Sequence, residues 1–78
     1  MRLDLFLKET RIIKRRTIAK EFCDRELVKV NGKVAKPSFE VKDNDQLEIK
    51  FGTKILKIIA HVEAGNKKEK VSYEPLAS

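Results

Sequence analysis

The 78-residue chain is long enough for one small domain, and 38% of its residues are charged, with a formal net charge of +6 at pH 7. Its single cysteine excludes an intrachain disulfide and a cysteine metal cluster, which favours a reducing, cytoplasmic compartment. Because the sequence has no apolar run near the roughly 20 residues of a membrane helix, we expect neither a membrane span nor a signal peptide.

Two helices are predicted in the N-terminal third of the chain. Apolar residues at helical spacing predict the first over about residues 2–9, and an apolar face predicts the second from Arg15 or Arg16 to Arg25. The connector between them is expected to place Ile12 or Ile13 in the core. The apolar residues that define the helices are Leu3, Phe6 and Leu7, and then Ile18, Ala19, Phe22 and Cys23.

A β-hairpin is predicted after Leu27, where the apolar period changes from helical to alternating. Asn31-Gly32 between β-branched residues is a strong signal for its turn, because both residues tolerate positive φ. Pro37 ends the hairpin, since proline cannot donate to a central ladder. Three valines are expected to share one face of the hairpin: Val28, Val30 and Val34.

Two longer strands are predicted to follow. A turn over residues 42–45, with Asn44 as its left-handed residue, precedes a strand over Gln46–Phe51. Gly52-Thr53 then turns the chain into a last strand over residues 54–62. This order of elements predicts an α+β fold, in which two N-terminal helices pack on a small, mainly antiparallel, twisted sheet.

The last sixteen residues have a different composition. Residues 63–78 are polar, with Gly65-Asn66 and several lysines, and we expect a flexible tail after a domain over residues 1–62. As an alternative within the tail, Val71-Ser72-Tyr73 could add a short strand or contact a partner.

Positive charge is concentrated at the start of the chain. Residues 1–20 hold seven Lys or Arg and two acidic residues, so they carry +5 of the net +6. Local charge of this kind favours a polyanionic partner, above all nucleic acid. Lys14, Arg15 and Arg16 lie at the start of the second helix, where Thr17 and free backbone amides would also favour a phosphate.

The basic residues and the hairpin tip together predict an RNA-binding surface. Phosphate contacts made by such side chains position a protein on folded RNA, so recognition would be mainly of shape. The alternative is that the charges are only solvated and that Asn31-Gly32 only forms the turn. Asp4 is expected to be structural, either orienting an arginine or capping the first helix. The candidate RNA-binding residues are Arg2, Arg11, Lys14, Arg15, Arg16, Thr17, Asn31, Lys33 and Lys36.

No catalytic set is recognisable in the sequence. Cys23 is expected to be buried, and His61 has no companion His or Cys for binding a metal. A lone His, one Cys and scattered acids supply no nucleophile with a base, and no glycine-rich phosphate loop is present. We therefore expect a binding module rather than an enzyme, with no cofactor, metal ion or small-molecule substrate. The four phenylalanines are expected in the core, with Phe39 as the candidate for stacking on a base.

Several short runs, taken together, resemble the S-four RNA-binding domain over about residues 1–52, which we take as the core motif. Within that superfamily, the first 21 residues are similar to the bacterial RqcP family, a relative of the heat-shock protein fifteen family. The runs are Arg2-Leu3-Asp4, Lys14-Arg15-Arg16-Thr17-Ile18-Ala19, Val28-Lys29-Val30-Asn31-Gly32, Lys36-Pro37-Ser38 and Asp45-Gln46-Leu47.

The resemblance implies an S-four-type, alpha-L-like fold and a role in ribosome-associated quality control. It implies docking on a large ribosomal subunit that carries stalled peptidyl-tRNA, with contacts to 23S-type rRNA and tRNA, in the cytoplasm. It also implies support for C-terminal alanine tailing by an RqcH/NEMF-type factor, and we expect a monomer. The alternatives are a general ribosome-assembly or heat-shock-type translation factor that binds rRNA, and a protein-binding scaffold.

The chain departs from the family pattern at three positions. Glu26 stands where the family has a glycine after the second helix, which should cost on the order of 1 kcal/mol if the left-handed backbone is kept. Asn44 replaces a second glycine, a milder change because asparagine tolerates this region. Leu5 stands where lysine is frequent, which removes one possible phosphate contact.

Overall fold

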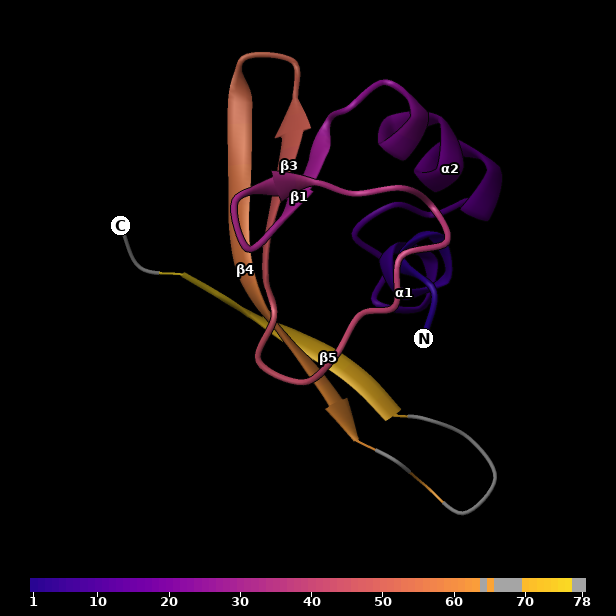
Figure 1. The fold of residues 1–78 in the computed structure, drawn as a ribbon, viewed down its shortest axis with the longest axis vertical. Coiled ribbons are helices and arrows are strands. Elements are labelled where there is room, and N and C mark those ends of the chain that lie inside the picture. The colour runs from indigo at the N-terminus through magenta and orange to yellow at the C-terminus, as the bar shows by residue number, and fades with distance from the viewer. Residues whose placement is uncertain (64, 66–69, 77–78) are drawn as a thin grey trace.

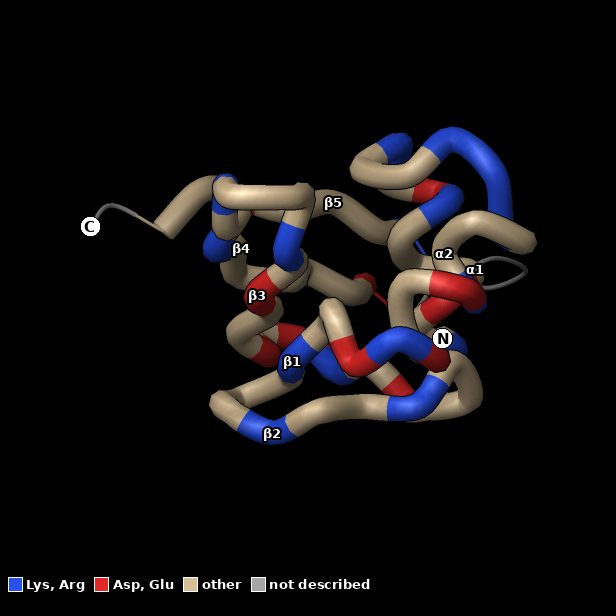
Figure 2. The backbone as a smooth tube through the Cα atoms, turned by 90° about the horizontal axis from the view of Figure 1, so that it is seen from above, with Lys and Arg blue, Asp and Glu red and all other residues tan. Residues whose placement is uncertain are grey.

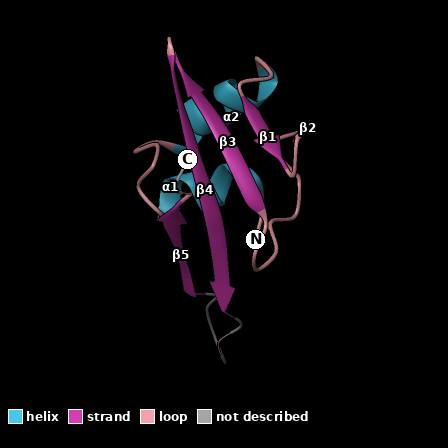
Figure 3. Ribbon diagram, turned by 90° about the vertical axis from the view of Figure 1, so that its left-hand side faces the viewer, coloured by secondary structure: helices cyan, strands magenta, loops and turns pink. Residues whose placement is uncertain are grey.

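The structure is a computed structural model that describes residues 1–63, 65 and 70–76. Two helices lie against one face of a five-stranded antiparallel sheet with the order β2-β1-β3-β4-β5 (Figures 1 and 3). The predicted α+β fold is therefore confirmed. None of the described helices is long and apolar enough to cross a membrane. The elements are α1 (Leu3–Glu9), α2 (Arg16–Asp24), β1 (Val28–Val30), β2 (Lys33–Val34), β3 (Gln46–Phe51), β4 (Lys54–Glu63) and β5 (Lys70–Pro75).

The hydrophobic core lies between the two helices and the sheet. Strand β3 pairs with both β1 and β4, and its alternate residues Leu47 and Ile49 are fully buried. Ile13 of the connector joins this core, whereas Ile12 is only partly buried against it. Helix α1 is held by three fully buried side chains at helical spacing, which are Leu3, Phe6 and Leu7.

Left-handed residues mark the predicted turns. Asn31 and Gly32 have φ of 52° and 84°, and Asn44 has φ of 71°, as the turn signals indicated. Glu26 keeps the left-handed backbone after α2, with φ of 61°. Its N–H donates to the Cys23 carbonyl at 3.0 Å and the next N–H donates to the carbonyl at position 22, so the helix ends in a complete Schellman motif.

Three apolar residues expected in the core, Val34, Ile18 and Phe39, are exposed instead. Val34 is 49% exposed, because the two-residue turn pairs it with Lys29 and paired residues share a face. Its neighbour Ala35 is buried in its place. Ile18 is 38% exposed, because the face of α2 that is buried runs through Ala19 and Cys23.

The C-terminal segment forms a strand, which corrects the expectation of a flexible tail over residues 63–78. Strand β5 pairs antiparallel with β4, with Tyr73 opposite Ala60 and Val71 opposite Val62. Val71 also packs against the hydrophobic core. The alternative of a short strand at Val71-Ser72-Tyr73 is confirmed, and the strand is longer than predicted. The expectation of flexibility at residues 64, 66–69 and 77–78 lies outside the described residues.

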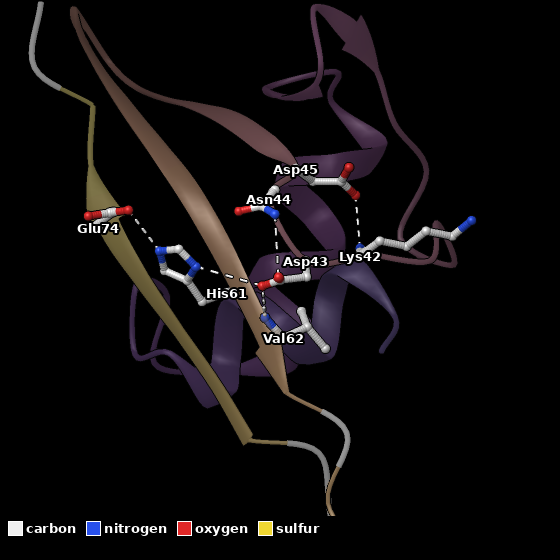
Figure 4. Close-up of polar contacts among 7 residues, drawn as sticks. All are labelled: Lys42, Asp43, Asn44, Asp45, His61, Val62 and Glu74. Atoms are coloured by element: carbon white, nitrogen blue, oxygen red, sulfur yellow. Dashed lines mark hydrogen bonds and ion pairs between the residues drawn. The ribbon is translucent and has the colours of Figure 1, made fainter.

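Side chains also attach β5 to the rest of the sheet (Figure 4). His61 of β4 places Nε2 2.8 Å from Glu74 Oε1 of β5, and Nδ1 3.7 Å from Asp43 Oδ1. The same Asp43 oxygen accepts a hydrogen bond from the Val62 N–H at 3.0 Å. His61 therefore links β5 and β4 to the turn that precedes β3.

Candidate RNA-binding surface

Asp4 joins the two helices within the predicted basic surface. Its side chain is 4% exposed, and its two carboxylate oxygens lie 3.3 Å from Arg2 Nε and 3.4 Å from Arg16 Nε. Oδ1 also accepts a hydrogen bond from the Leu5 N–H at 2.7 Å. One buried carboxylate thus holds an arginine from the start of each helix, as the structural interpretation of Asp4 anticipated.

The arginines held by Asp4 keep part of their hydrogen-bonding capacity. The Arg2 and Arg16 side chains are 50% and 46% exposed, and each guanidinium has five N–H donors. Asp4 engages the Nε side of both groups, so further donors on each are left for another acceptor. Because the carboxylate limits their rotation, the two cations lie close together in a fixed arrangement that suits a phosphate backbone.

The connector between α1 and α2 adds further positive charge. Lys14 and Arg15 are exposed, and Lys14 lines a shallow pocket of about 400 Å³ together with Lys8 and Arg11. Arg11 has φ of 62°, a left-handed backbone that turns the chain after α1. Glu9 also lines this pocket and lies 3.7 Å from Lys8. Lys8 was not predicted for the site, because it belongs to α1 whereas Arg11 follows the helix, so helical spacing does not relate the two residues.

The start of α2 is open to an anion. Arg15 is its N-cap residue, no side chain caps the helix there, and its first turn contains no acidic residue. Thr17 is exposed in this first turn. The positive end of the helix dipole therefore adds to the charges of Arg15 and Arg16.

Lys36 and Arg2 lie on a second groove, of about 510 Å³, between α2 and the segment after β2. Lys20 lines the same groove, one helical turn after Arg16, which is the spacing that could have predicted it. Asp24 and Glu26 also line it, so this groove has mixed charge. Figure 2 shows Lys and Arg gathered on the tube around the helices and their connector.

The side chain of Asn31 at the hairpin tip forms hydrogen bonds within the protein. The Asn31 side chain donates to Asp45 Oδ1 at 3.1 Å and accepts from the Gln46 N–H at 2.9 Å. These bonds tie the β1–β2 turn to the start of β3, so Asn31 has a structural function that the sequence pattern did not indicate. Lys33 is exposed on the edge strand β2, where it is open to a partner.

Cys23 is a core residue rather than a reactive one. It is buried on α2, and burial, followed by the charges of Asp4 and Asp24, raises the pKa of its thiol to about 11. The thiol therefore stays neutral at physiological pH. Of the aromatic residues expected in the core, Phe39 is 40% exposed, which corrects that expectation, and Phe22 and Phe51 are only partly buried.

The chain is similar to known proteins over most of its length. The family model described as S4 domain matches residues 1–47. The RQC P-site tRNA stabilizing factor of Streptococcus pneumoniae is 53% identical over 70 residues, which is 88% of this chain and 80% of the relative. That of Halalkalibacterium halodurans is 49% identical over 73 residues, 92% of this chain and 83% of the relative. Among solved structures, trimeric heat shock protein 15 of Vibrio cholerae has a TM-score of 0.75 and 29% identity, over 87% of this chain and 69% of that one.

Proposed function

The chain belongs to the S4 domain family and to the family of RQC P-site tRNA stabilizing factors, and from this premise we propose that it binds tRNA and rRNA during ribosome quality control. The observation that carries the proposal is the pair formed by Arg2 and Arg16 on buried Asp4. The pair belongs to the N-terminal segment that carries almost all of the net positive charge.

In detail, the protein docks on a large ribosomal subunit that still holds a stalled peptidyl-tRNA. Its basic surface contacts rRNA and tRNA together and keeps the tRNA in place while an RqcH/NEMF-type factor adds a C-terminal alanine tail. It acts as a monomer in the cytoplasm and supplies no catalytic group. Phosphate contacts from two helices and their connector would recognise the shape of the folded RNA rather than its bases.

The RNA partners are tested by purification through a C-terminal tag, followed by sequencing of the RNA that is recovered. We expect large-subunit rRNA together with tRNA. Recovery of small-subunit rRNA or messenger RNA, without large-subunit rRNA and tRNA, would contradict the proposal.

The tailing role is tested separately by deleting the gene and analysing the nascent chains that remain on stalled large subunits. We expect the alanine tails to be shortened or lost, because the tRNA would no longer be held in place. Complementation with the wild-type gene is the control that should restore them.

A second candidate is a heat-shock-type or ribosome-assembly factor that binds rRNA, which the similarity to heat shock protein 15 favours. Unchanged alanine tails after gene deletion, together with an accumulation of immature subunits, would support this function over tailing.

Charge reversal separates both RNA-binding functions from a protein-binding scaffold. Arg15→Glu with Arg16→Glu should abolish association with the ribosome at physiological salt, because the affinity depends on phosphate contacts. Since Arg16 also pairs with buried Asp4, circular dichroism is used to check that the fold persists. Lys54→Glu with Lys57→Glu, on strand β4, makes the same change in net charge and is the matched control. If the arginine variant still associates, phosphate contacts are not the main source of affinity and the scaffold function is favoured.

A further inference from the structure

An apolar groove lies beside the basic surface, between the connector, α2 and the end of β3. Its volume is about 350 Å³, and five of the seven residues that line it are apolar. The other two are Lys14 and Arg15, and no acidic residue lines it. The apolar residues are Ile12, Ile13, Ile18, Phe22 and Phe51.

The groove exposes part of two aromatic rings that the core does not cover completely. The rings of Phe22 and Phe51 have centroids 5.3 Å apart and planes tilted by 55°, and both side chains are partly buried. Ile18 adjoins them on the exposed side of α2, although the helix is anchored in the core by other residues. A partly exposed pair of rings with an exposed isoleucine makes an apolar surface beside a cluster of cations.

The two cationic side chains of the groove, Lys14 and Arg15, indicate that its ligand is negatively charged. Lys14 and Arg15 are exposed and belong to the basic cluster at the start of α2, so a polyanion bound to that cluster passes directly over the groove. A nucleotide combines a flat base with two apolar faces and a phosphate attached through the sugar. RNA loops and bulges present unstacked bases of this kind, which proteins bind on aromatic side chains and on the planes of arginines.

We propose that this groove receives one unstacked base of the bound RNA while Lys14 or Arg15 pairs with the adjacent phosphate. The inference rests on the RNA-binding function proposed above and deepens it, because it adds a contact to a base to a surface otherwise built for phosphates. An apolar side chain of a ribosomal protein would fit the groove in size. It is disfavoured because it would bring no negative charge to Lys14 and Arg15.

Ile18→Gln tests the groove without changing the charge of the protein. The probe is binding to purified large ribosomal subunits that carry P-site tRNA, measured over a range of salt concentrations. Because the variant keeps both rings and loses the apolar side chain beside them, it should bind about fivefold more weakly, as expected when part of the burial of one isoleucine is lost. The slope of log affinity against log salt should stay at the wild-type value, because no phosphate contact is removed.

Three further variants make the result specific. Ile18→Leu keeps the apolar surface and should bind like the wild type, and an unchanged circular dichroism spectrum of Ile18→Gln should exclude a loss caused by misfolding. Ile55→Gln, at an exposed isoleucine on β4 outside the groove, should bind like the wild type. Arg15→Gln should reduce the salt slope by about one, as expected for one phosphate contact.

The outcomes separate this inference from the proposed function. Wild-type protein that fails to bind the subunits overturns the proposed function itself. Wild-type binding that Ile18→Gln leaves unchanged overturns the base-binding groove alone.

The occupant is identified by photocrosslinking on the same subunits, with p-benzoylphenylalanine replacing Ile18. Adducts on nucleotides of rRNA or tRNA are expected. Adducts found only on ribosomal proteins would overturn the inference, because the groove would then dock a protein.

Discussion

Asp4 organises part of the basic surface, although it carries a negative charge. It is buried, and it brings arginines from both helices to one point. Replacing Asp4 with a neutral residue would therefore raise the net positive charge. It would also release the two arginines that the Asp4 carboxylate holds in place. A substitution of Asp4 that raises the net positive charge is therefore expected to lower the affinity for RNA.

Asp4→Asn is expected to weaken binding to large subunits despite the added positive charge. The amide cannot pair with both guanidinium groups, so we expect a roughly tenfold loss, or about 1.4 kcal/mol. The free energy of unfolding should also fall by about 1–3 kcal/mol, since buried partners are lost. Glu21→Gln, at an exposed position of α2, makes the same charge change and should not weaken binding. Tighter binding by Asp4→Asn would show that charge count alone governs affinity.

Cys23 is expected to resist alkylation in the folded protein. Its thiol pKa is raised from 9.0 to about 11, so the thiolate fraction near about pH 8 should fall by about 100-fold relative to the unfolded chain. Reaction with iodoacetamide, followed by mass spectrometry, should be slow in buffer and fast in denaturing urea. Because the folded-state pKa is the higher one, the neutral thiol favours the folded state below pH 9, and this contribution is lost as the pH rises toward 11.

At the scale of single residues, the sequence predicted the pairing of charged side chains better than the burial of apolar ones. Asp4 was expected beside an arginine because both types lie close together in the N-terminal segment. The partial exposure of Phe22 and Phe51 was not expected, because an aromatic residue at helical or alternating spacing has the same pattern whether its ring is covered or open. Whether these rings are covered depends on how the connector packs against β3, which the local sequence pattern does not specify.

The elements themselves were predicted well where a local signal defines them. Asn31-Gly32 and Asn44 indicate turns through backbone preference alone, and both turns form. Strand β5 was predicted only as a short alternative within the tail, because its sequence alternates weakly and follows a polar segment. Its register depends on β4, a partner that only the folded sheet provides.

Glu26→Gly is expected to stabilise the end of α2. Residue 26 has φ of 61°, which glycine adopts without the steric cost of a side chain, so the free energy of unfolding should rise by about 1 kcal/mol. Glu21→Gly inside the same helix is the matched control and should lower it by about 1 kcal/mol. Urea denaturation of both variants measures the difference. A loss of stability in Glu26→Gly would mean that the side chain makes a contact worth more than the backbone strain.

For the whole molecule, the affinity for large ribosomal subunits should fall as the salt concentration rises, because it depends on a small number of phosphate contacts. Arg2→Gln with Arg16→Gln is expected to reduce the slope of log affinity against log salt by about two, since each arginine is proposed to pair with one phosphate. Binding to large subunits, measured at several salt concentrations, gives the slope. The control is Lys54→Gln with Lys57→Gln, which should leave it unchanged. Equal slopes for the arginine variant and the wild type would remove Arg2 and Arg16 from the interface.

The strand order also determines how the molecule behaves in crowded surroundings. Strands β2 and β5 are the two edges of the sheet, and exposed edges can template lateral association with other chains. Strand β2 has only two residues, whereas β5 carries Lys70 and Glu74 and ends at Pro75. Short length, charge and proline are the means by which natural sheets avoid aggregation at their edges. These features disfavour the addition of further strands at either edge of the sheet.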